Sequence, residues 1–158
     1  MANILFGPRP QGIYFDDLKG NSYNPWYRYG QSKLANILFA NELNKREKIN
    51  NVTSVSLHPG NIISTNLSRS LDVSSMFSLV WAIKKSQLYR ITESKNIPQG
   101  TSTTLVCALD PNMQGGVYYE DCKVSGKVHE KAFDVETAEK LWTVSLSLLA
   151  AEGFECPN

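Results

Sequence analysis

The stretch WYRYGQSKLANILFANEL, residues 26–43, decides the fold of this chain. Its apolar residues fall on nearly every face of a helix, a pattern typical of a helix buried between layers. Charged residues resume at 45–48, KREK, and Asn50-Asn51 then interrupts the pattern. We therefore predict a long, buried helix over residues 26–48. The apolar positions concerned are Leu34, Ala35, Ile37, Leu38, Phe39, Ala40 and Leu43.

The first turns of this helix carry Tyr29 and Lys33, spaced as Tyr-x-x-x-Lys. Residues i and i+4 lie on one face of a helix, so the phenol and the ammonium can point at one spot. A nearby cation favours the phenolate, which makes Tyr29 a candidate general acid/base for chemistry at an alcohol or carbonyl. The spacing alone also fits a chance pair of solvated side chains, because short motifs match often.

The composition is that of a globular domain. Hydrophobic residues make up 42% and charged residues 20% of the 158, which excludes a disordered chain. The formal net charge of +1 gives no indication of a nucleic-acid partner or an acidic surface. A single domain is expected at this length.

Three cysteines, Cys107, Cys122 and Cys156, form no C-x-x-C pair, and their number is odd. This favours a reducing compartment over a disulfide framework. His58 and His129 do not stand at zinc-ligand spacing from these cysteines, so the sequence predicts no metal site.

Residues 1–11 lack the long apolar stretch of a signal peptide, and no run approaches 18 apolar residues. We therefore expect an intracellular protein, either cytoplasmic or peripheral on a membrane or lipid surface. Without a secretory signal, the N-x-[ST] sequences at Asn51 and Asn66 are interpreted as chance matches.

Helices and short strands alternate along the rest of the chain, which favours an α/β fold with parallel pairing. Residues 1–25 are rich in loop-forming residues. A strand over 52–57 ends at His58-Pro59-Gly60, and ligands bind at such carboxyl edges of open sheets. Further elements are predicted as helices over 76–85, from Pro98 to Leu109 and from an Asp134 cap to Leu149, and as a strand over 117–120.

Several segments together resemble the short-chain dehydrogenase/reductase family, in the branch of retinol dehydrogenases and WW-domain oxidoreductases. The likeness begins at Gly12, runs through the Tyr-x-x-x-Lys helix and extends to Leu149 in the same order. It is specific as an ensemble, although no single piece is. The segments are residues 12–43, VSLHPGNIISTNL at 55–67, QGTSTTL at 99–105, GVYYEDC at 116–122 and AEKLW at 138–142.

Two features of that family have no counterpart in this sequence. Its coenzyme fold opens with a glycine-rich turn that holds the pyrophosphate, and no such motif occurs here. Its catalytic serine ends the preceding strand, and residues 1–11 offer no matching strand. The resemblance therefore implies an incomplete C-terminal portion of a Rossmann-type doubly wound parallel sheet. We expect one partial domain, with a loop-rich start at 1–25, a catalytic-helix and substrate-side half at 26–150 and a tail at 151–158.

The resemblance also implies roles for particular residues. Tyr29 would relay the proton, while Lys33 would favour the phenolate and hold the nicotinamide ribose. Pro59, Gly60 and Thr65 would lie against the nicotinamide end of NAD or NADP, although Pro-Gly also makes an ordinary turn after a strand. Weak coenzyme binding is expected of this chain alone, because the glycine-rich turn is missing.

The helix expected at 76–85 corresponds to the family's substrate-covering helix, and its bulky apolar residues imply an apolar substrate. Burial in the core and contact with a membrane surface are the other interpretations. The resemblance thus implies an oxidoreductase that interconverts an apolar alcohol and a carbonyl, impaired when alone. The alternative is a non-enzymatic remnant that pairs with a related subunit, as a homo- or hetero-oligomer.

Overall fold

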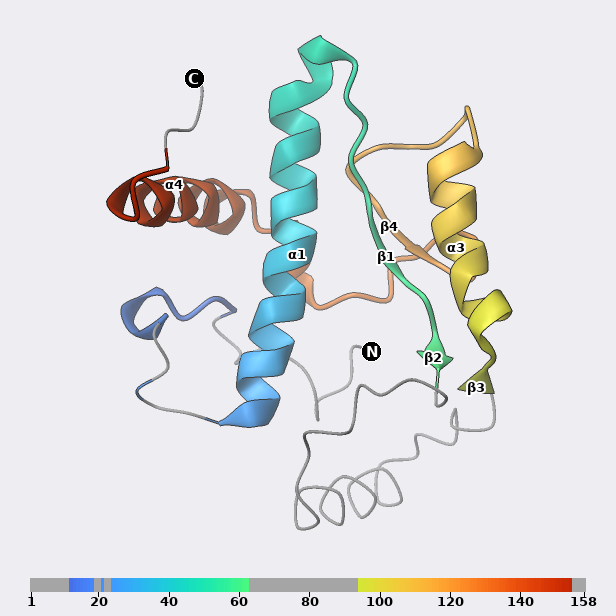
Figure 1. Cartoon of the computed structure of the whole chain (residues 1–158), viewed down its shortest axis with the longest axis horizontal. Coiled ribbons are helices and arrows are strands. Elements are labelled where there is room, and N and C mark those ends of the chain that lie inside the picture. Colours follow the sequence, from blue (N-terminus) through green and yellow to red (C-terminus); the bar gives the residue numbers. More distant parts are fainter. Residues whose placement is uncertain (1–11, 19–20, 22–23, 63–93, 155–158) are drawn as a thin grey trace. The chain divides into compact units, whose positions relative to one another are not determined.

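The structure is a computed structural model that describes residues 12–18, 21, 24–62 and 94–154. It has an α/β architecture of helices with short strands (Figure 1). This agrees with the predicted class, a part of a Rossmann-type fold. In chain order the elements are η1 Phe15–Asp17, α1 Pro25–Glu47, η2 Lys48–Asn50, β1 Ser56–His58, β2 Asn61–Ile62, β3 Ser94–Lys95, α3 Ile97–Leu109, β4 Tyr118–Glu120, β5 Lys123–Val124, η5 Glu130–Phe133 and α4 Val135–Ala151.

The described residues form two compact units. The first contains the residues before 57 together with 112–118 and 124–154, and therefore the helices α1 and α4. The second contains 57–62, 94–111 and 119–123, and therefore helix α3. A three-stranded sheet has the order β1-β4-β5, and β2 pairs with β3 in parallel, with Asn61 opposite Ser94. Parallel pairing is thus observed for β2 and β3, two strands that the sequence did not predict.

Helix α1 confirms the prediction from the sequence almost to the residue. Asn24 begins it, since its side-chain oxygen accepts from the Tyr27 N–H at 3.2 Å and its carbonyl accepts from the Arg28 N–H at 3.0 Å. Pro25 suits the first helical position, because that residue needs no N–H donor. At the other end the chain leaves the helix through Asn51, whose φ of 58° is left-handed.

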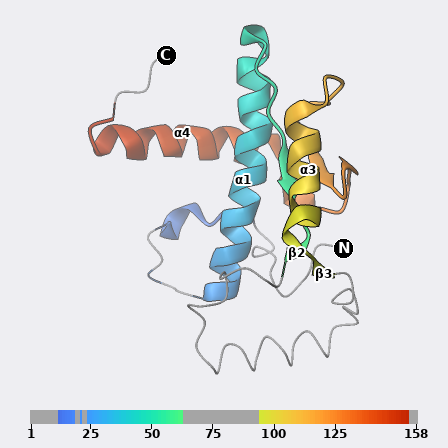
Figure 2. The same ribbon diagram turned by 45° about the vertical axis from the view of Figure 1, so that its right-hand side comes forward.

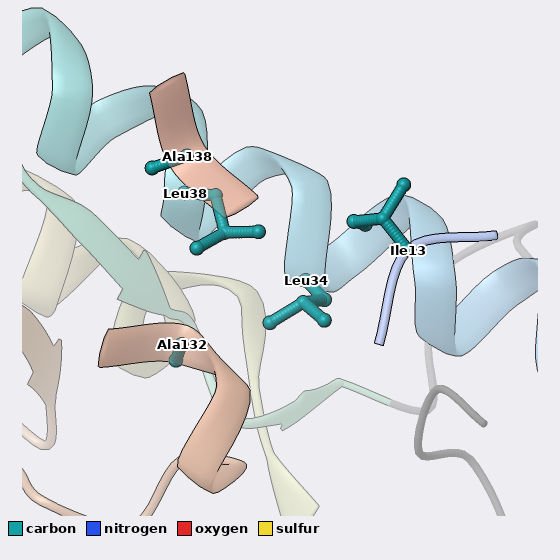
Figure 3. Packing of buried hydrophobic residues seen from close by; sticks show 5 residues of the cluster. All are labelled: Ile13, Leu34, Leu38, Ala132 and Ala138. Atoms are coloured by element: carbon teal, nitrogen blue, oxygen red, sulfur yellow. The ribbon is translucent and has the colours of Figure 1, made fainter. Parts of the chain in front are cut away.

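One stripe of α1 faces the core of the first unit. Leu34 and Leu38, one turn apart, are buried against Ile13, Ala132 and Ala138 (Figure 3). The predicted burial of the helix on all sides is wrong for Phe39, which is 50% exposed. The reason is that the segments packed on this core, around Ile13, η5 and the start of α4, cover the Leu34–Leu38 stripe.

Helix α4 runs across α1 (Figure 2). A buried carboxylate of α1 and its partners connect the two helices. Glu42 is only 2% exposed, and its Oε1 accepts from Arg46 Nε at 2.6 Å. Lys45 pairs both with Glu42 and with Glu139 of α4. The charge of Glu42 is tolerated in the interior because it is paired.

Both later helices begin at side-chain caps. Asp134 accepts from the Thr137 N–H at 3.0 Å at the start of α4, as predicted. Asn96 and Gln99 form a reciprocal capping box at the start of α3, with Pro98 in its first turn. Gly153, beyond the end of α4, has a φ of +83°. Local signals therefore set the ends of these helices.

The strands depart more from prediction than the helices do. The strand predicted at 52–57 is observed as the shorter and shifted β1, Ser56–His58, whereas β4 matches the prediction at 117–120 closely. Trp142 and Tyr118 are half-buried. The helix predicted at 76–85 lies outside the described residues.

A tight hairpin joins β4 to β5. Its two turn residues, Asp121 and Cys122, have φ values of 52° and 62°. Two consecutive left-handed residues are the mark of a type I′ turn, whose twist matches that of paired strands. The turn fixes the direction in which the Cys122 side chain leaves the backbone.

Candidate active site on helix α1

Tyr29 and Lys33 lie on one face of α1, as their spacing predicted. Lys33 Nζ stands 5.3 Å from the centre of the Tyr29 ring. Both side chains are exposed, and Tyr29 retains 43% of its accessible surface. The Tyr29 side chain is therefore open to a ligand and has a cation over its ring.

Other faces of the same turns are fixed to the segment that precedes the helix. Arg28 donates to the Asp17 carbonyl and to Asp17 Oδ2, both at 2.6 Å, and both side chains are largely buried. Gln31 Oε1 accepts from the Tyr14 N–H at 3.0 Å. These contacts hold the first two turns of α1 without using the face that carries Tyr29 and Lys33.

Ser32 lies within the motif, but its side chain makes a hydrogen bond to the helix backbone. Its hydroxyl donates to the Tyr29 carbonyl at 2.8 Å, a hydrogen bond within the helix. The side chain is exposed and serves the local backbone.

The predicted Pro59-Gly60 turn follows β1 in the second unit. Gly60 has a φ of +91°, and its N–H donates to His58 Nδ1 at 2.9 Å. The Lys95 side chain lies across the glycine, so a Cβ at Gly60 would stand 2.5 Å from Lys95 Cδ. The turn is thus built as the sequence predicted. Thr65, the third residue expected there, lies outside the described residues.

Sequence reasoning missed Lys95 and the Arg28–Asp17 pair. Lys95 reaches Gly60 through the pairing of β2 with β3, and its ammonium is paired with Asp121. Neither contact is recognisable from the sequence, because Arg28 and Asp17 are 11 positions apart and Lys95 and Asp121 are 26 apart, so that only the fold brings them together. Within the described part of the chain, no group of three or more His, Cys, Asp or Glu residues could hold a metal ion.

Comparison with known proteins supports the resemblance. The chain is 40% identical to human retinol dehydrogenase 14 over 141 residues, and 39% identical to the chloroplastic short-chain dehydrogenase TIC 32 B of Brassica napus over 144 residues. These matches cover 84% and 88% of this chain. It belongs to the short-chain dehydrogenase/reductase family. Human WW domain-containing oxidoreductase is a further relative, at 35% identity over 131 residues and 82% of this chain.

The aligned region covers most of this chain but less than half of each relative. It spans 38% of human retinol dehydrogenase 14, 42% of TIC 32 B and 29% of the WW domain-containing oxidoreductase. No protein-family model matches the sequence. Among the described residues of this short-chain dehydrogenase/reductase chain, no helix is long and apolar enough to cross a membrane.

Proposed function

We propose that this chain carries the proton-transfer side of an NAD(P)-dependent oxidoreductase that interconverts an alcohol and a carbonyl. One observation carries the proposal: the exposed phenol of Tyr29 has the Lys33 ammonium 5.3 Å from its ring centre, on the same face of α1. The Arg28–Asp17 pair holds this part of the helix in place, so that a rigid element presents both groups.

In the oxidation direction, Tyr29 as phenolate accepts the proton of the substrate hydroxyl. In the reduction direction, its phenol donates a proton to the carbonyl oxygen. By resemblance, Lys33 would assist this proton transfer and hold the ribose of the coenzyme. The bound nicotinamide coenzyme would supply the hydride acceptor or donor.

The residues at the Pro59-Gly60 turn fit the nicotinamide end of such a coenzyme. The turn follows the carboxyl end of β1, where open α/β sheets bind ligands. The sequence has no glycine-rich turn for the pyrophosphate, so we expect weak binding by this chain alone. A dissociation constant near 1 μM, about −8 kcal/mol, in calorimetric titration would contradict this expectation.

An apolar alcohol or carbonyl is the proposed substrate class. Relatives are named retinol dehydrogenases, and residues 76–85, MFSLVWAIKK, supply a bulky apolar segment where the family covers its substrate. The same resemblance supports a related short-chain dehydrogenase/reductase subunit as partner. An intracellular location, cytoplasmic or at a membrane surface, fits both proposals.

The test is a chimera in which the coenzyme-binding portion of human retinol dehydrogenase 14 precedes this chain, assayed with NAD(H), NADP(H) and apolar alcohols. Tyr29→Phe should lower the turnover by roughly 10²- to 10⁴-fold, since it removes the proton relay. Tyr27→Phe is the matched control, because Tyr27 is equally exposed at 43% and lies on the same helix. It should retain the activity of the parent.

Lys33→Met tests the second residue, with Lys48→Met, an exposed lysine beyond the helix, as its control. Loss of activity in both tyrosine variants, or in neither, would overturn the assignment of Tyr29. A chimera that is folded but inactive, together with a chain that copurifies with a related subunit, would instead favour the non-enzymatic pairing module.

A further inference from the structure

Two cysteines approach the same side chain in the second unit. Thr103 of α3 is fully buried, and its hydroxyl accepts from the Cys122 N–H at 3.2 Å. The same oxygen lies 3.8 Å from Cys122 Sγ. Cys107 follows Thr103 by one helical turn, and the Cβ atoms of such a pair are about 5–6 Å apart. Cys107 and Cys122 therefore both lie beside Thr103.

The hairpin turn holds Cys122 in place without covering it. Cys122 is the second residue of the type I′ turn, and its backbone N–H is bound by Thr103. Asp121, the first turn residue, pairs with Lys95. Cys122 is nevertheless an exposed residue. A thiol that is fixed in direction and open to solvent is suited to thiol–disulfide exchange.

The environments of the two thiols differ. Cys107 is half-buried, whereas Cys122 is exposed, and both are free cysteines. Burial raises the pKa of the Cys107 thiol, and the negative charge of a Cys122 thiolate raises this pKa further. Cys122 is therefore the more accessible of the two to an external reagent.

We propose that Cys107 and Cys122 form a reversible modification site for low-molecular-weight disulfides, of which oxidised glutathione is the probe. The Cys122 thiolate attacks one sulfur of the reagent, forms a mixed disulfide and expels a glutathione thiolate. The Cys107 thiolate then attacks Cys122 Sγ, which forms the Cys107–Cys122 disulfide and expels the second glutathione. The protein loses two hydrogens, and the two glutathiones take up the protons and the electrons.

The experiment uses the folded full chain with Cys156→Ser, which leaves only this pair. After treatment with oxidised glutathione, intact mass should show the loss of two hydrogens, and a digest should contain peptides joined through Cys107 and Cys122. Cys107→Ser should keep glutathione on Cys122, because the resolving thiol is absent. Cys122→Ser should react at least about tenfold more slowly, since Cys107 is less exposed.

Thr103→Val tests the geometry, because it removes the hydroxyl that holds the Cys122 N–H. The mixed disulfide should then persist longer, whereas the matched Thr104→Val, at an exposed position of α3, should resolve at the parent rate. The proposal is overturned if glutathione remains on Cys122 as long in the parent as in the Cys107→Ser variant. It is also overturned if the disulfide forms no faster in the folded chain than in urea. None of these readouts depends on the proposed oxidoreductase activity.

Discussion

Trp142 of α4 stacks on Phe39 of α1, with ring centroids 5.5 Å apart and ring planes 14° apart. The Arg46 guanidinium, also on α1, lies 5.0 Å from the centre of the Trp142 ring. Stacked aromatic rings attract each other, and a cation is attracted to the face of an aromatic ring. These contacts therefore fix α4 to the half of α1 that follows the candidate site.

Trp142→Ala should lower the free energy of unfolding by about 2 kcal/mol, less than a fully buried tryptophan would, because the indole is only half-buried. Urea unfolding followed by circular dichroism measures the change. Ile49→Ala is the control, since Ile49 is 87% exposed and its truncation should stay within about 0.5 kcal/mol. Equal effects of the two substitutions would show that the stacking contributes nothing.

Arg28→Met should destabilise the first unit by about 3 kcal/mol, because it leaves the carboxylate of Asp17 buried without this partner. Limited proteolysis should also cut residues 12–24 sooner in this variant, since Arg28 holds that segment through two hydrogen bonds. Lys127→Met, at an exposed lysine, is the control and should match the parent in both measurements. Unchanged cleavage in Arg28→Met would contradict the role of the pair.

Gly60→Ala should cost about 1–2 kcal/mol, because alanine disfavours the observed φ of +91°. The new methyl group would in addition displace the Lys95 side chain from the turn. Gly126→Ala is a matched control, since no atom lies within 4 Å of a Cβ placed there. Thermal melting of both variants decides the matter, and a Gly60→Ala variant as stable as Gly126→Ala would exclude strain at the turn.

Asp134 should make the stability of α4 depend on pH in the acidic range. Hydrogen bonds from the Thr137 N–H and the Lys131 side chain lower the pKa of Asp134 below its usual 3.8. A carboxylate with a depressed pKa stabilises the fold fully above its unfolded value, and this stabilisation is lost as the pH falls through the folded value. We therefore expect the contribution to disappear below about pH 4.

Asp134→Asn is the matched variant for that test, because asparagine also caps helices but does not titrate there. As the pH is lowered from 6 to 3, the melting temperature of the parent should fall more than that of Asp134→Asn, so that the two values converge. Parallel curves over this range would show that the carboxylate charge of Asp134 contributes nothing to stability.

The sequence by itself determined the helices and the local geometry of the candidate site. The apolar periodicity predicted α1, and Pro98 and Asp134 marked the starts of α3 and α4. Tyr29 and Lys33 share a face for the same reason, since a helix brings residues four apart together wherever it forms. Each of these features depends on residues within one or two turns of each other, so a short stretch of sequence is enough to predict it.

Only the tertiary structure decided which distant residues meet. Phe39 belongs to an apolar run, yet its exposure and its partner Trp142 depend on where α4 packs. The strand expected at 52–57 is observed as Ser56–His58, because the extent of a strand depends on its neighbour as well as on its own residues. Thr103 meets Cys122 through the hairpin. Such contacts depend on the free energy of packing the whole fold, which cannot be derived from the local propensities of the residues.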